Sequence, residues 1–261
     1  AVSTGSQVLN LVTFVITQFA MGITVLIARY IGEKKQELIG QVIGGSIIIF
    51  AIISAVLFFV MICFSRRIAI VMQAPSEAVG LTSVYVKICG GGIFFIVAYN
   101  LLSAIFRGLG DSKSPLIFVA GLKMDAAGAA IATVFAQAVS VMLALFMLVK
   151  RNKIFTMTKS DFKINMHCKR ALKIGIPLAL QEFLTQVSFL ALCAFVNRLG
   201  LEASSGYGVA CKIVNFAMLV PSALMQSMAS FVSQNIGAGN EKRAQKAMFT
   251  GIGVGLVIGC I

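Results

Sequence analysis

The feature that most constrains this chain is a series of long apolar runs separated by short polar connectors. A helix needs about 20 apolar residues to cross ~30 Å of hydrocarbon, because each residue adds about 1.5 Å along its axis. Runs of this length occupy residues 7–28, 39–64, 77–106, 126–149, 171–197 and 203–233, and a further run begins near residue 244. They predict an all-α fold, a polytopic bundle of transmembrane helices.

Composition excludes a water-soluble globule. Hydrophobic residues make up 59% of the 261 positions and charged residues 12%, which leaves too little polar surface to face water. The net charge of +13 does not indicate a nucleic-acid partner, because the basic residues lie in connectors between apolar runs rather than on one patch. The chain begins without Met and stops inside an apolar run, so we expect both termini to be cut.

The residue types that carry catalysis are sparse. The six Cys are scattered through apolar runs without metal-ligand spacing, and the lone His167 lies in a basic linker, where we interpret it as a solvated loop residue. We find no nucleophile with a neighbouring base and no phosphate-binding glycine loop. We therefore expect neither an enzyme nor a cofactor.

The distribution of Lys and Arg predicts the orientation of the spans. Most of the 22 basic residues follow the first, third, fourth and sixth runs, and the positive-inside rule places those connectors in the cytoplasm. Connectors 107–113 and 150–173 then share a side, although only one full run separates them. We expect about one spanning helix to be missing between Pro115 and Lys123, deleted or omitted. The alternative is a re-entrant stub, whose backbone would be unpaired in lipid.

Two parts of the chain resemble each other in the same orientation. Residues 5–14 resemble residues 208–216, and Ala28-Arg29-Tyr30-Ile31-Gly32 resembles Ser233-Gln234-Asn235-Ile236-Gly237, each followed by a charged connector. Such parallel repeats occur in secondary transporters. We predict two parallel-repeat lobes around a central cleft: an N-terminal lobe over residues 1–150, a basic cytoplasmic linker over 151–170 and a truncated C-terminal lobe over 171–261.

Polar side chains recur at helical spacing in the first and sixth runs, which the repeat makes equivalent. The stripe of the sixth run consists of Lys212, Asn215, Ser222, Gln226, Ser230 and Ser233. In lipid such a face is expected to look at protein or water, so matching stripes predict a wet cleft between the lobes. The alternative is hydrogen bonding between helices. The run at 171–197 adds a third polar face. The candidate cleft residues are Asn10, Thr17, Gln181, Glu182, Thr185, Lys212, Asn215 and Gln226.

Glu182 is the acidic candidate in this set. It lies ~13 Å along the helix from Lys173, near mid-membrane, and Lys212 lies at a similar depth on the next helix. A lone charge there costs on the order of 3 kcal/mol, and pairing would offset much of this. A structural ion pair is the alternative to a functional role. We interpret Gly90-Gly91-Gly92 as a site of close packing rather than of bending.

Four motifs in order resemble the multidrug and toxic compound extrusion (MATE) family. Residues 107–115 (RGLGDSKSP) resemble the connector after its fourth helix, and residues 128–133 (GAAIAT) the start of its sixth. Residues 175–181 (GIPLALQ) resemble its seventh helix, and residues 234–239 (QNIGAG) the end of its eighth. The chain then holds helices two, three, four, six, seven and eight, a stub of the fifth and the start of the ninth.

The resemblance implies a secondary active antiporter that exports cationic or amphipathic drugs or metabolites in exchange for H⁺ or Na⁺ by alternating access. It would be a multi-pass, monomeric protein of the bacterial inner membrane, with lipid and small organic cations as partners and no nucleic acid. A flippase for lipid-linked precursors and an inactive fragment are the alternatives.

The chain departs from the family pattern at the coupling sites. Relatives with a cation site in the N-terminal lobe place an acidic residue on the first helix and polar or acidic groups on the fifth. Both helices are absent or cut here, so Asn100 and Thr133 remain as candidate polar partners. Another branch carries Glu eight residues after the proline of the seventh helix. That position is Thr185 here, and Glu182 lies one turn earlier.

Overall fold

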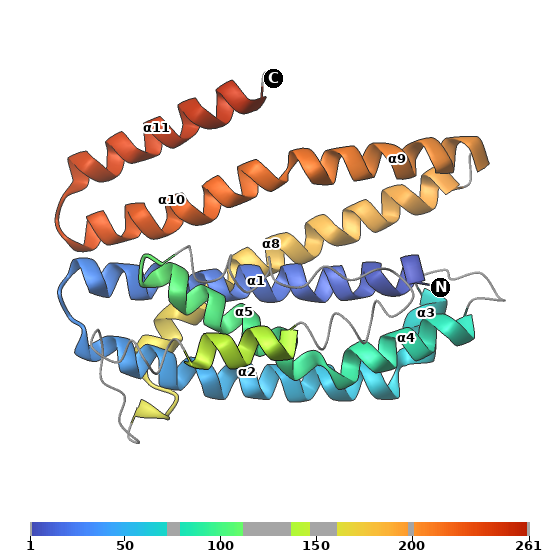
Figure 1. Ribbon diagram of the computed structural model, residues 1–261, viewed down its shortest axis with the longest axis horizontal. Helices are drawn as coiled ribbons and strands as arrows, with labels where there is room; N and C mark the ends of the chain where they lie inside the picture. Colours follow the sequence, from blue (N-terminus) through green and yellow to red (C-terminus); the bar gives the residue numbers. More distant parts are fainter. Residues whose placement is uncertain (1, 72–78, 112–136, 147–160, 198–200, 260–261) are drawn as a thin grey trace.

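The computed structural model describes residues 2–71, 79–111, 137–146, 161–197 and 201–259, and every regular element within them is helical (Figure 1). The helices are α1 (Val2–Gly32), α2 (Glu37–Cys63), α3 (Ser65–Val71), α4 (Val79–Gly91), α5 (Ile93–Gly108), α8 (Met166–Asn197), α9 (Leu201–Ala217), α10 (Leu219–Gly237) and α11 (Glu241–Gly259). A short apolar helix, Gln137–Phe146, lies between α5 and α8 in the sequence. The all-α prediction is confirmed.

Three of the predicted apolar runs, 7–28, 39–64 and 77–106, become a helix or a helix pair long and apolar enough to cross a membrane. In the described part of the chain, Gln7–Gly32 and Glu37–Cys63 qualify by length and hydropathy as single helices, and α4 with α5 qualifies as a bent pair. The pair bends by 52° at Gly92. The glycine run provides both close packing, which we favoured, and a bend: Gly90 packs closely on Met61 of α2, and the chain bends beside it. The missing-helix prediction falls on residues 112–136, outside the described residues.

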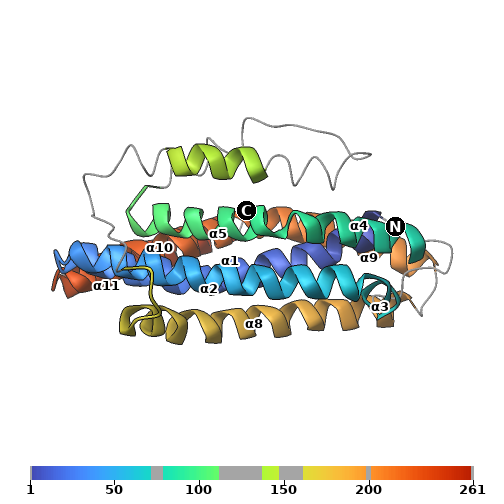
Figure 2. The ribbon, with the colours of Figure 1, turned by 90° about the horizontal axis from the view of Figure 1, so that it is seen from below.

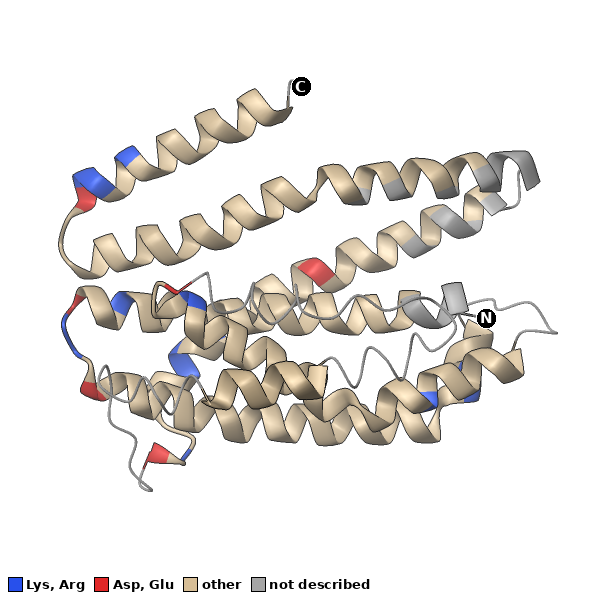
Figure 3. Ribbon diagram, in the orientation of Figure 1, with Lys and Arg blue, Asp and Glu red and all other residues tan. Residues whose placement is uncertain are grey.

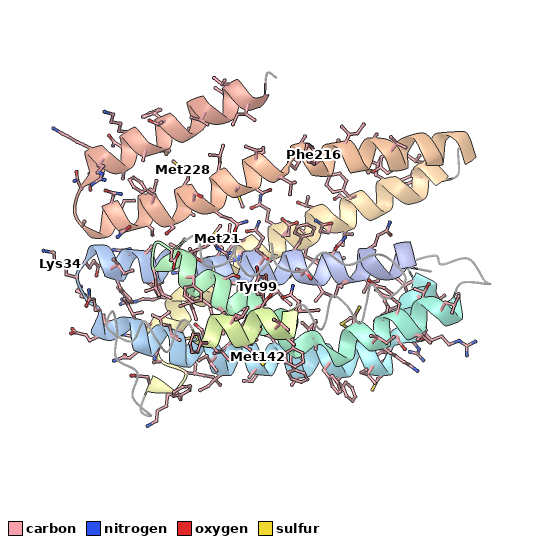
Figure 4. All side chains as sticks on the ribbon, viewed as in Figure 1. Met21, Lys34, Tyr99, Met142, Phe216 and Met228 are labelled. Carbon is pink, nitrogen blue, oxygen red and sulfur yellow. The ribbon has the colours of Figure 1, made fainter. Side chains whose placement is uncertain are left out.

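Helix α1 lies at the centre of the bundle. It packs against α2, α4 and α5 on one side and against α8 and α10 on the other. Figure 2 shows α8 and the α4–α5 pair on opposite sides of α1 and α2, with the Gln137–Phe146 helix beyond α5. Helix α11 packs on α10, where Met228 lies against Gly251; Figure 4 shows Met228 on the side of α10 that faces α11.

The buried core belongs mainly to α1, α2, α4 and α5. Its fully buried side chains include Ile27, Ile39, Ile43, Ile96 and Ile105, so β-branched and aliphatic residues fill the space between these four helices. By contrast, the large apolar side chains of α9 and α10 are mostly exposed, as at Phe216, where the two helices meet (Figure 4). Apolar exposure of this kind requires lipid or further protein around the helices.

The basic residues gather at one end of the bundle. Figure 3 shows Lys and Arg concentrated where α1 joins α2, where α8 begins and where α10 joins α11, and α5 ends there too. We call this the basic end. Connectors 107–113 and 150–173 were predicted to share a side, and the end of α5 and the start of α8 lie together at this end (Figures 1 and 3).

Three helices stop at the basic end in the same way. A residue in the left-handed region follows each helix: Lys34 with φ 58°, Gly110 with φ 80° and Gly239 with φ 71°. In each case the next backbone N–H donates a 2.9 Å hydrogen bond to a carbonyl five residues earlier, which satisfies a carbonyl that the helix leaves unpaired. These bonds run from Lys35 to Tyr30, from Asp111 to Phe106 and from Asn240 to Asn235.

Candidate functional site

The two halves of the chain meet in a reciprocal contact between α1 and α10. A Cβ on Gly32 would overlap the carbonyl oxygen of Gln234, and a Cβ on Gly237 would overlap that of Arg29. These positions are equivalent in the sequence repeat, since Arg29 and Gly32 correspond to Gln234 and Gly237. A contact in which i meets j and j meets i is what an approximate twofold axis produces. The parallel repeat is thus visible as geometry at this end of the bundle.

Helix α1 also packs against α8 with the two backbones in close contact, as it does against α10. A Cβ on Gly22 would overlap the carbonyl oxygen of Ala171, and a Cβ on Gly175 would overlap that of Phe19. Small residues let two backbones approach in this way, which is how helices associate where there is no hydrophobic driving force between them. We call the contacts of α1 with α8 and α10 the seam.

Two serines of the predicted polar stripe on the sixth run serve the seam rather than a cleft. Ser233 Oγ donates a 2.9 Å hydrogen bond to the carbonyl oxygen of Val25 on α1. Ser230 Oγ donates a 2.7 Å bond to the carbonyl oxygen of Arg107 on α5. For these two positions the alternative reading of the stripe, hydrogen bonding between helices, is the one the structure shows.

Helix α9 diverges from α1 away from the basic end (Figure 1), while α8 stays against α1 and α2 there. Helix α10 packs on α1 and α5, whereas its continuation α9 packs on α8 and α10. Along this part of the seam the candidate cleft residues Asn10, Gln181 and Thr185 are exposed, and Gln226 is half-buried. The Thr185 hydroxyl donates back to the Gln181 carbonyl oxygen at 2.9 Å.

Glu182 is half-buried on α8, midway along this 32-residue helix. Gln186 Nε2, one turn further on, donates a 2.8 Å hydrogen bond to Glu182 Oε1, which leaves the second carboxylate oxygen with free acceptor capacity. The side chains of Lys212 and Asn215 lie outside the described part of the chain, so the Glu182–Lys212 pair stays a prediction.

An apolar cavity of about 310 Å³ lies between α1, α2 and α8, and Glu182 is not among its lining residues. Its walls come from both halves and include Val15, Ile53, Ala179 and Phe183. Phe183 is the neighbour of Glu182 in the sequence. A carboxylate next to an apolar wall is chemically suited to a cation that carries an apolar body.

Thr17 and Asn100, predicted as members of different sets, come together inside the N-terminal half. Thr17 Oγ1 lies 2.7 Å from Asn100 Oδ1, and Asn100 Nδ2 donates to the Ile96 carbonyl oxygen. Thr17 therefore faces α5 rather than the α8 side. One turn along α5, Ser103 Oγ is buried and has no hydrogen-bond partner among the described residues. Thr133 lies outside the described residues.

A second cavity, of about 630 Å³, lies at the basic end between α1, α8 and α10. The sequence did not predict this cavity. The number of basic residues in each connector indicates which side of the membrane the connector lies on, but not which of those residues line the same cavity. Its polar lining consists of Arg29, Tyr30, Glu33, Lys35, Arg170, Lys173 and Ser233. Hydrogen bonds from Lys35 and then Arg29 hold the pKa of Glu33 below its ordinary value.

His167 is not the solvated loop residue that we predicted. Its Nδ1 lies 2.7 Å from the Tyr30 hydroxyl, and its ring meets the Tyr30 ring edge-on, with centroids 5.5 Å apart. The contact ties the start of α8 to the end of α1. Burial, followed by the charge of Arg170, lowers the pKa of His167 below its ordinary value.

Comparisons with known proteins place this geometry in a family. The MatE family model matches residues 1–122 and 177–261, which correspond to the two halves. The probable multidrug resistance protein YpnP of Bacillus subtilis is 30% identical over 187 residues, covering 66% of this chain and 42% of YpnP. The probable multidrug resistance protein YoeA of the same organism is 24% identical over 273 residues, covering 94% of this chain and 59% of YoeA.

The chain thus spans about half the length of these relatives. A MATE transporter solved in complex with MaD3S shares the fold, with a TM-score of 0.84 at 23% identity over 98% of this chain and 62% of that one. From the family pattern in both halves, the chain belongs to the MATE family of membrane transporters, which are not enzymes.

Proposed function

We propose that this chain forms part of a secondary active antiporter that exports cationic or amphipathic compounds in exchange for H⁺ or Na⁺. The observation that carries the proposal is the form of the seam: α10 packs on α1 and α5 at the basic end, whereas α9 leaves α1 beyond it. Two lobes that are joined at one end and parted at the other match one state of an alternating-access cycle. The names of YpnP and YoeA, both probable multidrug resistance proteins, support the substrate class.

We infer that the substrate lies along α8 between the lobes. Glu182 would attract a cation, the exposed amide of Gln181 and the hydroxyl of Thr185 would contact its polar groups, and the apolar cavity would receive its hydrophobic part. Asn10, Gln226, Lys212 and Asn215 complete the proposed cleft. Such a site is mostly apolar with a few polar groups, as expected for drug-sized ligands.

The coupling ion is proposed at one of two places. Oxygen ligands suit Na⁺, and Thr17 with Asn100 offers two of them inside the N-terminal lobe. Thr133 stays a further predicted candidate for this site. The Glu182 carboxylate could instead carry H⁺ and exchange it for the substrate. We expect the protein to act as a monomer in the plasma membrane.

The test uses vesicles containing the protein expressed from its complete gene, loaded with ethidium as the organic cation and driven by a pH or Na⁺ gradient. We expect Glu182→Gln to lower the exchange rate by about tenfold or more, since a lost charge-assisted contact costs about 1.5–3 kcal/mol. Glu241→Gln, which removes an exposed carboxylate at the start of α11, is the matched control and should leave the rate unchanged. Equal rates for Glu182→Gln and wild type would remove Glu182 from the mechanism.

A further inference from the structure

The 630 Å³ cavity at the basic end is built by both lobes. Arg29 and Glu33 come from the end of α1 and its connector, Arg170 and Lys173 from the first turns of α8, and Ser233 from the end of α10. Its apolar lining residues, which we call the floor, are Val25, Leu26, Leu38, Ile174 and Ile236, and we call its charged lining residues the rim. The cavity therefore combines a charged rim with an apolar wall, and it exists only while the lobes are together at this end.

The charges on the rim do not balance. Glu33 is its only carboxylate among the described lining residues, and both of its oxygens are occupied: Arg29 Nε lies 2.9 Å from Oε1 and Lys35 Nζ lies 2.9 Å from Oε2. Arg170 and Lys173 lie three residues apart, on one face of α8. Within the described part of the chain, neither forms an ion pair with a carboxylate. The rim thus keeps excess positive charge facing a concave apolar space.

Other basic residues near this end lack that setting. Arg170 and Lys173 are exposed, as are Lys242 and Lys246 on α11, but Lys242 and Lys246 do not line the cavity. The positive-inside rule accounts for the gathering of basic residues at this end. It does not require cations from two lobes to converge on one apolar cavity, where a low-dielectric wall strengthens their attraction for an anion.

We propose that this cavity binds the phosphate headgroup of an anionic phospholipid, with Arg170 and Lys173 contacting the phosphate from α8 and Arg29 from α1, and an acyl chain lying along the apolar floor. The apolar floor favours a lipid over a soluble phosphate, and the basic end is the side where anionic headgroups meet cytoplasmic cations. A ligand held by both lobes binds the closed seam more tightly than an open one and so favours the closed state. This last consequence rests on the proposed function, whereas the site itself does not.

The experiment measures binding of short-chain phosphatidylglycerol to the protein in phosphatidylcholine nanodiscs. Short-chain phosphatidylcholine and inorganic phosphate form the other two arms, and native mass spectrometry counts bound lipid. The second readout is the NMR titration of His167, the only His in the chain, because an anion at Arg170 should raise the pKa of His167. Neither readout depends on transport activity.

We expect saturable binding of phosphatidylglycerol that weakens roughly tenfold or more in Arg170→Gln/Lys173→Gln, and about threefold in Lys173→Gln alone. The matched control Lys242→Gln/Lys246→Gln removes the same charge outside the cavity and should change affinity less than twofold. Three results would each overturn the proposal: equal binding by the double variant and wild type, equal affinity for phosphatidylcholine, or equal affinity for inorganic phosphate. Failure of drug exchange with intact lipid binding would count against the proposed function alone.

Discussion

At the scale of single residues, Lys34 stands out because it occupies a backbone conformation that its counterparts leave to glycine. Its φ is 58°, and the equivalent positions after α5 and α10 are Gly110 and Gly239. A residue with a Cβ is destabilised by about 1–2 kcal/mol in the left-handed region, and glycine is not. Glycine loses more conformational entropy on folding, however, so the net stabilisation from glycine is smaller than that.

We therefore expect Lys34→Gly to raise the free energy of unfolding by about 0.5–1 kcal/mol. Lys34 is suitable because it takes no part in the ion pairs that Arg29 and Lys35 make with Glu33. Gly239→Lys is the reverse change at the equivalent site and should lower stability by a similar amount. Thermal unfolding in detergent, followed by circular dichroism, measures both. A fall in stability for Lys34→Gly would contradict the strain that we assign to this position.

His167 should respond to pH because its surroundings disfavour the charged ring. Burial is the larger cause and Arg170 the smaller, so the pKa of His167 lies below 6.5 in the folded protein. A lowered pKa on a base means that the folded state loses stability as pH falls through 6.5 towards the folded value, and that nothing changes above 6.5. The Tyr30 hydroxyl is the polar group that faces the ring from α1.

We expect Arg170→Gln to raise the pKa of His167 only part of the way to 6.5, because burial remains. The change is measured by NMR titration of the single imidazole in lipid without anionic headgroups. Arg243→Gln, on α11, is the control and should leave the titration in place. An unchanged pKa in Arg170→Gln would show that the charge of Arg170 does not reach the ring.

At the scale of elements, the seam depends on glycines at which one helix meets the backbone of another. A methyl group at Gly22 would overlap a carbonyl oxygen of α8, and backbone cannot rotate away as a side chain can. Gly22→Ala and Gly175→Ala should therefore each lower the free energy of unfolding by about 1–3 kcal/mol, the cost of overpacking. Thermal unfolding in detergent checks this.

Gly80→Ala is the matched control, because it lies in helix α4 with no atom within 4 Å of the added Cβ. It should be neutral or stabilising by up to about 1 kcal/mol, since alanine favours the helix. If Gly22→Ala behaved like Gly80→Ala, the close crossing of α1 and α8 would not exist in the membrane.

The elements show which parts of such a fold can be predicted from sequence. Spanning helices were predictable because lipid demands a minimum apolar length. The bend at Gly92 and the break at Met218 were not, because hydropathy averages over a window and is insensitive to direction. The spacing of Ser230 and Ser233 predicted a polar face. It did not show which helix that face contacts, because the contact depends on how the helices pack in the bundle. The basic cavity was missed for the same reason.

At the scale of the whole molecule, α1 links the two lobes, and the contacts that join them are short, polar or glycine-mediated. They include Ser233 on Val25 and the reciprocal pair of Gly32 and Gly237. Asn235 is the buried residue of α10 in the part that the structure describes, so separating α10 from α1 exposes little buried apolar surface, whereas α8 shares the main core with α1 through Ala171. The N-terminal lobe, by contrast, is joined internally by fully buried residues such as Ile39 and Ile96. The molecule should therefore open at the seam while each lobe moves as a unit.

Spin labels at Lys34 and Asn240, which follow α1 and α10 at the basic end, report on this opening. In the protein expressed from its complete gene, we expect the distance between them to gain a longer population when substrate or the coupling-ion gradient is applied. Labels at Lys34 and Arg66 span the N-terminal lobe alone and should keep one distance throughout. Pulsed electron paramagnetic resonance measures both pairs. A change in the Lys34–Arg66 distance as large as that across the seam would mean that the lobe deforms, so that the seam would no longer be the hinge between two rigid halves.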